Sequence, residues 1–100
     1  MAKFRLTKKA VEDLTGIWNY TCENWSENQA DIYYQLLIDG FNEIANDPTL
    51  GRNFYEVIDN LKGLKVGRHI VFYHLVSKQM VEIIRILHEQ MDLKIRMIEK

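Results

Sequence analysis

Two blocks that are dense in β-branched and aromatic residues dominate the second half of the chain, at Val66–Tyr73 and Ile84–His88. Such residues fit the pleated, largely buried surface of a sheet. The break at Ser77-Lys78 between them is short enough for a β-hairpin, although it lacks the Asn-Gly or Asp-Gly of the strongest hairpin signals. The pattern therefore predicts that the two blocks pair as antiparallel strands.

A two-residue turn at this break fixes an expected register for the hairpin. Phe72 then lies opposite Ile83, and Ile70 lies opposite Arg85. One face is mainly aliphatic and also carries Arg68 and Arg85, about two residue pairs apart. The other face mixes aliphatic residues with polar ones, namely Tyr73, His69 and His88.

The first half of the chain predicts a short strand and two helices. Lys3–Leu6 alternates polar and apolar residues, as a strand does. Thr7 is placed to cap a helix over about residues 8–25, which carries an apolar stripe at helical spacing. Ser26 and Gln29 form a capping box that starts a second helix, which runs to about residue 45 and ends before a proline. With almost no linker between them, the two helices are expected to form an antiparallel hairpin.

Aromatic residues at helical spacing in this hairpin are expected to belong to the core or to the helix–helix contact. They are Trp18, Trp25, Tyr33 and Tyr34. Gly16 lies inside the apolar pattern of the first helix, where glycine costs about 1 kcal/mol relative to alanine. A glycine at this position is expected to let a neighbouring element approach the helix closely.

The remaining segments complete one α+β domain over residues 1–100. Residues 48–60 form a long connection, and residues 61–66 supply a strand that Gly67 turns into the hairpin. Residues 93–98 fit either a short helix or a tail. The resulting order, β-α-α-β-β-β, predicts an antiparallel-rich sheet covered on one face by an N-terminal helical hairpin.

Composition and charge narrow the class of protein. Hydrophobic residues make up 47% of the chain and charged residues 27%, as in an ordinary globular domain. No apolar run approaches the roughly 20 residues of a membrane span, and no signal peptide is evident. The single Cys22 fits a reducing compartment, so a cytoplasmic protein is expected. The net charge of −1 argues against a basic face for direct, sequence-specific nucleic-acid binding.

Several polar residues on or beside the hairpin form a candidate site. The three histidines lack the spacing of metal ligands, so neither a metal nor a cofactor is expected. A general acid/base and phosphate-clamping set is one interpretation, and salt-bridged or partner-facing residues are the other. The residues concerned are Glu56, Arg68, Tyr73, Arg85 and His88.

Sequence pieces along almost the whole chain resemble the ParE-type toxins of the RelE/ParE superfamily. They include Phe4-Arg5-Leu6-Thr7, Asp13-Leu14, Trp25, Gln29-Ala30, Gly51-Arg52, Val66-Gly67-Arg68, Val71-Phe72-Tyr73 and Arg85-Ile86-Leu87-His88. The resemblance implies a toxin of a type II toxin–antitoxin system, with the element order given above. It also implies a cognate ParD-like antitoxin that wraps the toxin in a hetero-oligomer, and DNA gyrase as the poisoned target. Target- or antitoxin-binding residues are then expected at Lys62, Arg68, Tyr73, Arg85 and His88.

The same superfamily contains ribosome-dependent mRNA interferases, which are the alternative. For that endoribonuclease activity the resemblance implies Glu56, Arg85 and His88 as catalytic residues. Ile70, however, stands where these enzymes hold a phosphate-binding arginine, and loss of such a group typically costs 10²-fold or more. A gyrase inhibitor without catalytic residues is therefore favoured. A low-potency homologue that only binds a partner is a third interpretation.

Overall fold

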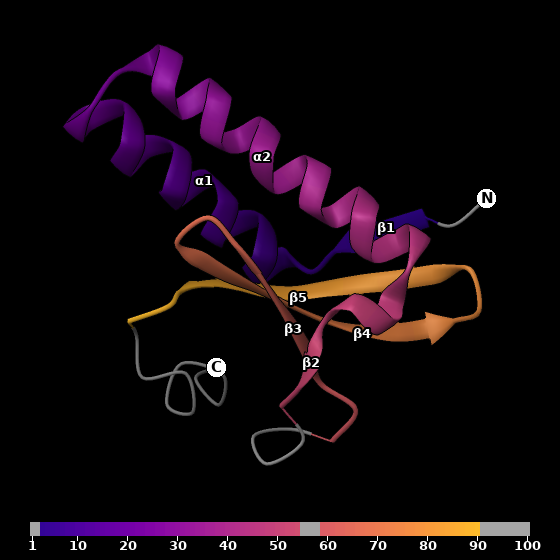
Figure 1. Ribbon diagram of the computed structural model, residues 1–100. Helices are drawn as coiled ribbons and strands as arrows, with labels where there is room; N and C mark the ends of the chain where they lie inside the picture. The colour runs from indigo at the N-terminus through magenta and orange to yellow at the C-terminus, as the bar shows by residue number, and fades with distance from the viewer. Residues whose placement is uncertain (1–2, 55–58, 91–100) are drawn as a thin grey trace.

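The computed structural model describes residues 3–54 and 59–90, and these form the predicted α+β fold. Two helices and a five-stranded mixed sheet are arranged in two layers (Figure 1). The elements in order are β1 Lys3–Leu6, α1 Lys8–Asn24, α2 Glu27–Asn46, the 3₁₀ turn η1 Pro48–Leu50, β2 Arg52–Asn53, β3 Lys62–Val66, β4 His69–Ser77 and β5 Met80–His88. Glu56 and the 93–98 segment, for which expectations were stated, lie outside the described residues.

Both helices begin at the residues that the sequence predicts. The Thr7 hydroxyl accepts a hydrogen bond from the Ala10 N–H at 3.1 Å, and the Ser26 hydroxyl accepts one from the Gln29 N–H at 3.0 Å. Each bond satisfies a backbone donor that has no partner inside its own helix. Ser26 follows α1 so closely that α2 must run back alongside it, which confirms the helical hairpin (Figure 1).

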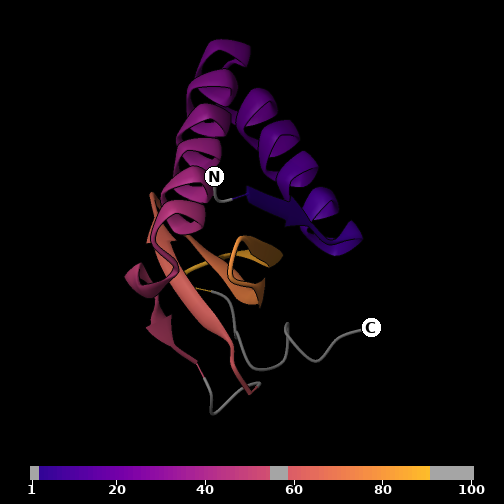
Figure 2. The same ribbon diagram turned by 90° about the vertical axis from the view of Figure 1, so that its right-hand side faces the viewer.

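The sheet has the order β1-β5-β4-β3-β2. β1 runs parallel to β5, whereas the other neighbours are antiparallel. The helical hairpin covers one face of this sheet, as the turned view in Figure 2 shows. None of the helices in the described part of the chain has the length and apolar character needed to cross a membrane.

The expected register of the long hairpin is wrong. The turn lies one residue later, at Lys78-Gln79, and Ser77 pairs with Met80. Phe72 lies opposite Arg85 rather than opposite Ile83, because moving the turn by one residue moves each partner on β5 by two. Irregularities between Leu75 and Ser77 and between Phe72 and Tyr73 shift the pairing by one residue in the stretch they enclose, so Tyr73 lies opposite Ile83, and the two shifts cancel at Phe72. Arg68 lies in the β3–β4 turn and not on a strand.

The core between helices and sheet is built from apolar residues at the predicted spacing. Leu37, Phe41 and Ile44 of α2 are fully buried against residues such as Val71 and Ile83 of the sheet. A smaller cluster of Phe54, Leu61, Phe72 and Leu87 forms a second group of buried residues.

Two aromatic residues of the helical hairpin are not buried as expected. Trp25 is 76% exposed and Tyr34 is 39% exposed. The expectation for Gly16 is also wrong, because a Cβ at this position would meet nothing within 4 Å. Close approach occurs at Gly40 instead, where a Cβ would lie 2.9 Å from a methyl carbon of Val66.

Candidate functional site: a groove between the helical hairpin and the end of β5

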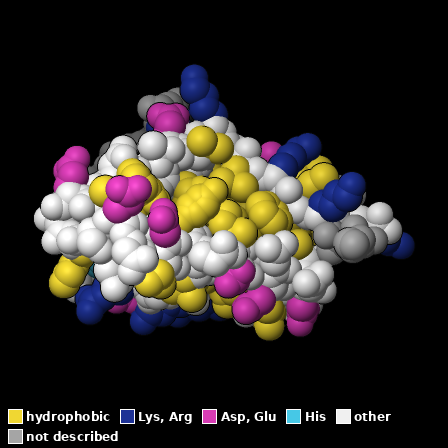
Figure 3. Space-filling view, turned by 90° about the horizontal axis from the view of Figure 1, so that it is seen from above, with side chains coloured by type: hydrophobic (Ala, Val, Ile, Leu, Met, Phe, Trp, Pro, Cys, Tyr) yellow, Lys and Arg dark blue, Asp and Glu magenta, His cyan; other side chains and the backbone are white. Residues whose placement is uncertain are grey.

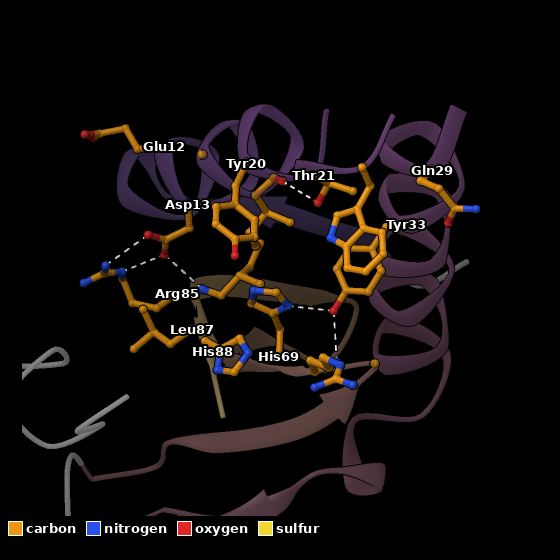
Figure 4. A pocket seen from close by; sticks show the side chains of 16 residues that line it. Glu12, Asp13, Tyr20, Thr21, Gln29, Tyr33, His69, Arg85, Leu87 and His88 are labelled. Carbon is orange, nitrogen blue, oxygen red and sulfur yellow. Dashed lines mark hydrogen bonds and ion pairs between the residues drawn. The ribbon is translucent and has the colours of Figure 1, made fainter. Parts of the chain in front are cut away.

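A groove with a volume of about 1110 Å³ lies between the helical hairpin and the C-terminal end of β5. One wall comes from α1 and the start of α2, and the other comes from the β3–β4 turn and β5 (Figure 4). Its apolar lining includes Ile17, Ile86 and Leu87, together with the exposed rings of Tyr20 and Trp25. Its polar lining includes Asp13, Tyr33, Arg68, His69, Arg85 and His88.

The α1 wall follows from helical spacing. Asp13, Ile17, Tyr20 and Thr21 recur at intervals of three or four residues and so project on one side of the helix. Gly16 lies among them and adds no side chain, which leaves this stretch of the wall open. With Glu12 also in the lining, the wall is a mixture of two carboxylates, aliphatic surface and the exposed ring of Tyr20.

Asp13 and Arg85 join α1 to β5 at one end of the groove. Arg85 donates to both carboxylate oxygens of Asp13, from Nε at 2.7 Å and from Nη2 at 3.0 Å. The side chains are only 12% and 14% exposed. Asp13 Oδ2 also accepts the backbone N–H of Ile86 at 3.0 Å. β1 pairs with β5 only as far as Ile83, so the Asp13 carboxylate satisfies an edge amide beyond the end of β1.

Tyr33 of α2 organises the other end of the groove, at the β3–β4 turn. Its phenol oxygen accepts the backbone N–H of Arg68 at 3.0 Å and lies 2.6 Å from Nδ1 of His69. Burial raises the pKa of Tyr33 above its ordinary value, which keeps the phenol protonated. Gly67 in this turn has φ +60°, and a Cβ there would lie 2.7 Å from the Tyr33 hydroxyl. The turn therefore needs glycine both for its backbone conformation and for contact with Tyr33.

His69 and His88 face each other across β4 and β5 on the floor of the groove. They are a direct cross-strand pair, and their rings meet edge to face with centroids 5.3 Å apart. Burial, and next the neighbouring His88, lower the pKa of His69 to about 4. His69 is therefore neutral at neutral pH.

The structure separates the five expected binding residues into different surroundings. Arg68, Arg85 and His88 all line the groove, although Arg85 is held by Asp13. Lys62 lies outside this lining on β3, where its ammonium donates to Asn53 Oδ1 at 2.7 Å. Arg68 and Arg85 do not project side by side from one strand face, because Arg68 belongs to the turn. The charge partner of Arg85 is a carboxylate of this chain, Asp13.

Tyr73 is a core residue and the expectation that it contacts a partner is wrong. Its side chain is 0% exposed. Its hydroxyl donates to the Pro48 carbonyl at 2.6 Å and accepts the Gly51 N–H at 2.9 Å. Tyr73 therefore anchors the chain between α2 and β2 to the sheet.

Three groove residues were not singled out as site residues from the sequence: Asp13, Tyr33 and His69. Asp13 carries a usable signal, because it shares the helical spacing of Ile17 and Tyr20. Tyr33 and His69 are 36 residues apart, and no local pattern links them. Only the packing of α2 over the β3–β4 turn brings them together.

A second apolar surface lies on the outside of the helical hairpin. Val11, Leu14, Trp18 and Tyr34 surround a shallow hollow of about 620 Å³, where the Trp18 indole N–H donates to Asp31 at 3.2 Å. Seen from above, apolar side chains gather over this hairpin, with acidic side chains nearby (Figure 3). Its lining offers one carboxylate and no cation, so the groove has the richer chemistry.

The groove is suited to binding a segment of another protein. Apolar and aromatic surface lies between polar ends, as in grooves that receive a helix or an extended peptide. Among residues 3–54 and 59–90, no three His, Cys, Asp or Glu side chains come together as metal ligands. Of the two arginines that line the groove, Arg85 is paired with Asp13.

Comparison with known proteins identifies a family over nearly the whole chain. The family model described as the ParE toxin of the type II toxin–antitoxin system parDE matches residues 4–93. The chain is 34% identical to Toxin ParE1 of Caulobacter vibrioides over 92% of this chain and 94% of that protein. It is 29% identical to Toxin ParE1 of Mycobacterium tuberculosis over 91% of this chain and 93% of that protein. It is also 29% identical to Toxin ParE of Escherichia coli over 100% of this chain and 97% of that protein.

Solved structures show the same fold at low sequence identity. A chain from a chromosomal ParDE toxin–antitoxin system of P. aeruginosa matches with a TM-score of 0.75 and 16% identity, over 88% of this chain and 96% of that one. A chain from the toxin–antitoxin complex RelBE2 of Mycobacterium tuberculosis matches with a TM-score of 0.66 and 14% identity, over 88% and 98%. From the family match and the fold together, this chain belongs to the ParE toxin family of type II toxin–antitoxin systems.

Proposed function

We propose that this toxin poisons DNA gyrase and that a cognate ParD-like antitoxin neutralises it by occupying the groove. Membership of the ParE toxin family supports the toxin role. The relatives of known structure come from ParDE and RelBE toxin–antitoxin systems, which supports a protein partner. The mixed apolar and polar lining of the groove has the character of a surface that receives another polypeptide segment.

The Asp13–Arg85 ion pair is the main observation that favours a toxin acting by binding its target over a nuclease. An mRNA interferase needs an arginine that meets the charge of the phosphorane. Both Asp13 oxygens hold the guanidinium of Arg85, and both side chains are largely buried. Freeing Arg85 for a phosphate would leave a buried carboxylate without its partner, which typically costs about 3–5 kcal/mol.

The charge around the groove also opposes RNA binding. Residues 8–46, which form the helical hairpin, carry two lysines against seven carboxylates, a net charge of −5. Affinity for nucleic acid comes mainly from cations that neutralise phosphates. The α1–α2 wall of the groove would repel an RNA backbone.

Arg68 and His88 are the residues for which target and antitoxin are proposed to compete. Both line the groove, so an antitoxin segment placed there would cover them. Lys62 lies outside the groove lining and is proposed to contact gyrase separately. Neutralisation then follows from direct competition for the same surface.

Ribosome-dependent mRNA cleavage is the second candidate function, because His88 lines the groove and the RelBE2 chain shares the fold. Expression of the toxin in cells separates the two. Gyrase-linked DNA breaks should accumulate, while the 5′ ends of cellular mRNA stay at their normal positions. Codon-positioned mRNA cuts that vanish in His88→Ala would establish the interferase instead.

A further inference from the structure

We infer that the end of the groove at the β3–β4 turn accepts a side-chain carboxylate of the antitoxin, held by Arg68, His69 and His88. This inference rests on the proposed function, because it names the chemistry by which the groove recognises its partner. It also gives the bound segment a direction, since only one end of the groove takes the acidic side chain.

Hydrogen bonding fixes where each imidazole carries its proton. The Gln90 N–H donates to Nδ1 of His88 at 3.1 Å, so that nitrogen is an acceptor. The Tyr33 oxygen already accepts the Arg68 N–H, and its own hydrogen is directed to Nδ1 of His69 at 2.6 Å rather than to the Val66 carbonyl at 3.4 Å. A neutral imidazole with an accepting Nδ1 bears its hydrogen on Nε2.

Two N–H donors are therefore available on the floor of the groove. Among the described residues, no hydrogen-bond partner is recorded for Nε2 of His69 or of His88. No buried side-chain nitrogen or oxygen in the described chain lacks a partner, so both Nε2 atoms are reached by solvent. Donors that already point to solvent lose little when a carboxylate replaces water, and they gain from its charge.

The charges nearby place the incoming carboxylate at this end. The Arg68 side chain is exposed and lines the groove beside Tyr33 and His69. Glu89, a competing carboxylate near His69, is held by Lys65 at 2.9 Å. At the opposite end Glu12 is exposed and Arg85 is occupied by Asp13, so an acidic side chain would be repelled there.

A peptide carboxylate fits this site better than a nucleic-acid phosphate. One exposed arginine and two N–H donors match a single carboxylate, whereas an RNA backbone would bring further charges against Glu12 and the acidic hairpin.

The test measures the affinity of the full-length toxin for the full-length antitoxin encoded beside it. Arg68→Ala should weaken binding about tenfold at low salt and less at high salt. Arg52→Ala is the matched control, because Arg52 is also an exposed arginine but stacks on Phe54 away from the groove. If Arg68→Ala and Arg52→Ala lose the same amount of affinity for the antitoxin, the inference is overturned.

Two substitutions at the floor test the donors themselves. His88→Gln can keep an N–H donor near the position of Nε2, whereas His88→Leu removes it, so only the second should weaken binding several-fold. Glu89→Gln removes a competing negative charge and should tighten binding. An affinity that falls in Glu89→Gln, or that is equal in both His88 variants, would count against a carboxylate site.

A double-mutant cycle identifies the partner atom. Each Asp and Glu in the C-terminal half of the antitoxin is changed to Asn or Gln, and its effect is measured with wild-type toxin and with Arg68→Ala. Neutralising one particular antitoxin carboxylate should weaken binding to the wild-type toxin about tenfold, and it should leave binding to Arg68→Ala unchanged. Additive effects at every acidic position, or tight binding of an RNA oligonucleotide that depends on Arg68, would refute the assignment.

A separate set of variants tests whether the antitoxin occupies the groove at all, as the proposed function requires. Tyr20→Ala and Trp25→Ala remove exposed rings from the groove, and Ile32→Ala removes an exposed side chain that is not part of it. If neither aromatic variant weakens binding more than Ile32→Ala, the antitoxin does not occupy the groove. If the aromatic variants weaken binding but Arg68 and His88 do not, only the carboxylate site is wrong.

Discussion

Two tyrosines hold turns of this toxin in place through their hydroxyl groups. Tyr73 is buried and connects the sheet to the chain that follows α2, through Pro48 and Gly51. Tyr33 connects α2 to the β3–β4 turn, through Arg68 and His69. The first tyrosine serves the scaffold, and the second sets the shape of the groove.

Tyr73→Phe should destabilise the fold by about 2 kcal/mol. The ring is kept, but a partly buried carbonyl and a buried N–H lose their partner, and the loss of a buried partner typically costs about 1–3 kcal/mol. Urea unfolding followed by circular dichroism measures the change. Tyr34→Phe is the control, because Tyr34 is 39% exposed. A variant as stable as the wild type would show that water replaces the hydroxyl without loss.

His69 should make stability fall as the solution becomes acidic. Its pKa in the folded protein is about 4, below the ordinary value of 6.5, because burial disfavours the charged ring. The unfolded state therefore binds the proton first, and folded stability is lost as the pH falls from about 6.5 to about 4. The loss should approach about 2 kcal/mol once solvent screening is allowed for.

Urea unfolding at several pH values measures this loss, and NMR titration of the imidazole measures the pKa directly. His69→Asn keeps an oxygen near the position of Nδ1 and should flatten the pH profile in this window. A His69 that titrates near 6.5 would contradict the buried, neutral ring.

At the scale of the elements, α1 and β5 are joined by one carboxylate. Asp13 holds Arg85 and the Ile86 N–H just beyond the point where β1 stops pairing with β5. Asp13→Asn should cost about 3 kcal/mol in unfolding free energy, because it leaves the largely buried guanidinium without its counter-charge.

An exposed ion pair supplies the control for Asp13. Arg5→Ala breaks the contact with Glu82, where the arginine side chain is 55% exposed, and should cost under about 1 kcal/mol. Thermal or urea unfolding of both variants gives the comparison. If Asp13→Asn is no more damaging than Arg5→Ala, the pair does not hold α1 against β5, and Arg85 becomes available for other chemistry.

Local chemistry explains which elements can be predicted from the sequence. The caps at Thr7 and Ser26 and the apolar spacing of α2 act within a few residues, so they locate both helices correctly. No local sequence pattern predicts the irregular pairing near Phe72 or the two-residue strand β2, because both depend on packing between distant segments. The same holds for Tyr33 and His69, which meet only in the folded chain.

At the scale of the whole molecule, charge is divided between the two layers. The helical hairpin carries a net charge of −5, while the described residues 52–54 and 59–90 carry six basic against three acidic residues. The groove lies where these parts meet, with Glu12 and Asp13 on the helical side and Arg68 on the sheet side. A partner that crosses the groove therefore meets charges of opposite sign on its two sides, which favours one orientation of binding.

This ParE-family toxin is proposed to act by binding gyrase and not by cutting nucleic acid. This action is tested most directly with purified toxin, gyrase, ATP and supercoiled plasmid, by measuring the linear DNA released after detergent and protease treatment. Linear DNA with gyrase bound to its 5′ ends should rise with toxin concentration, and an equimolar amount of antitoxin should abolish the rise. Absence of gyrase-linked DNA, together with toxin-dependent cleavage of mRNA on translating ribosomes, would contradict it.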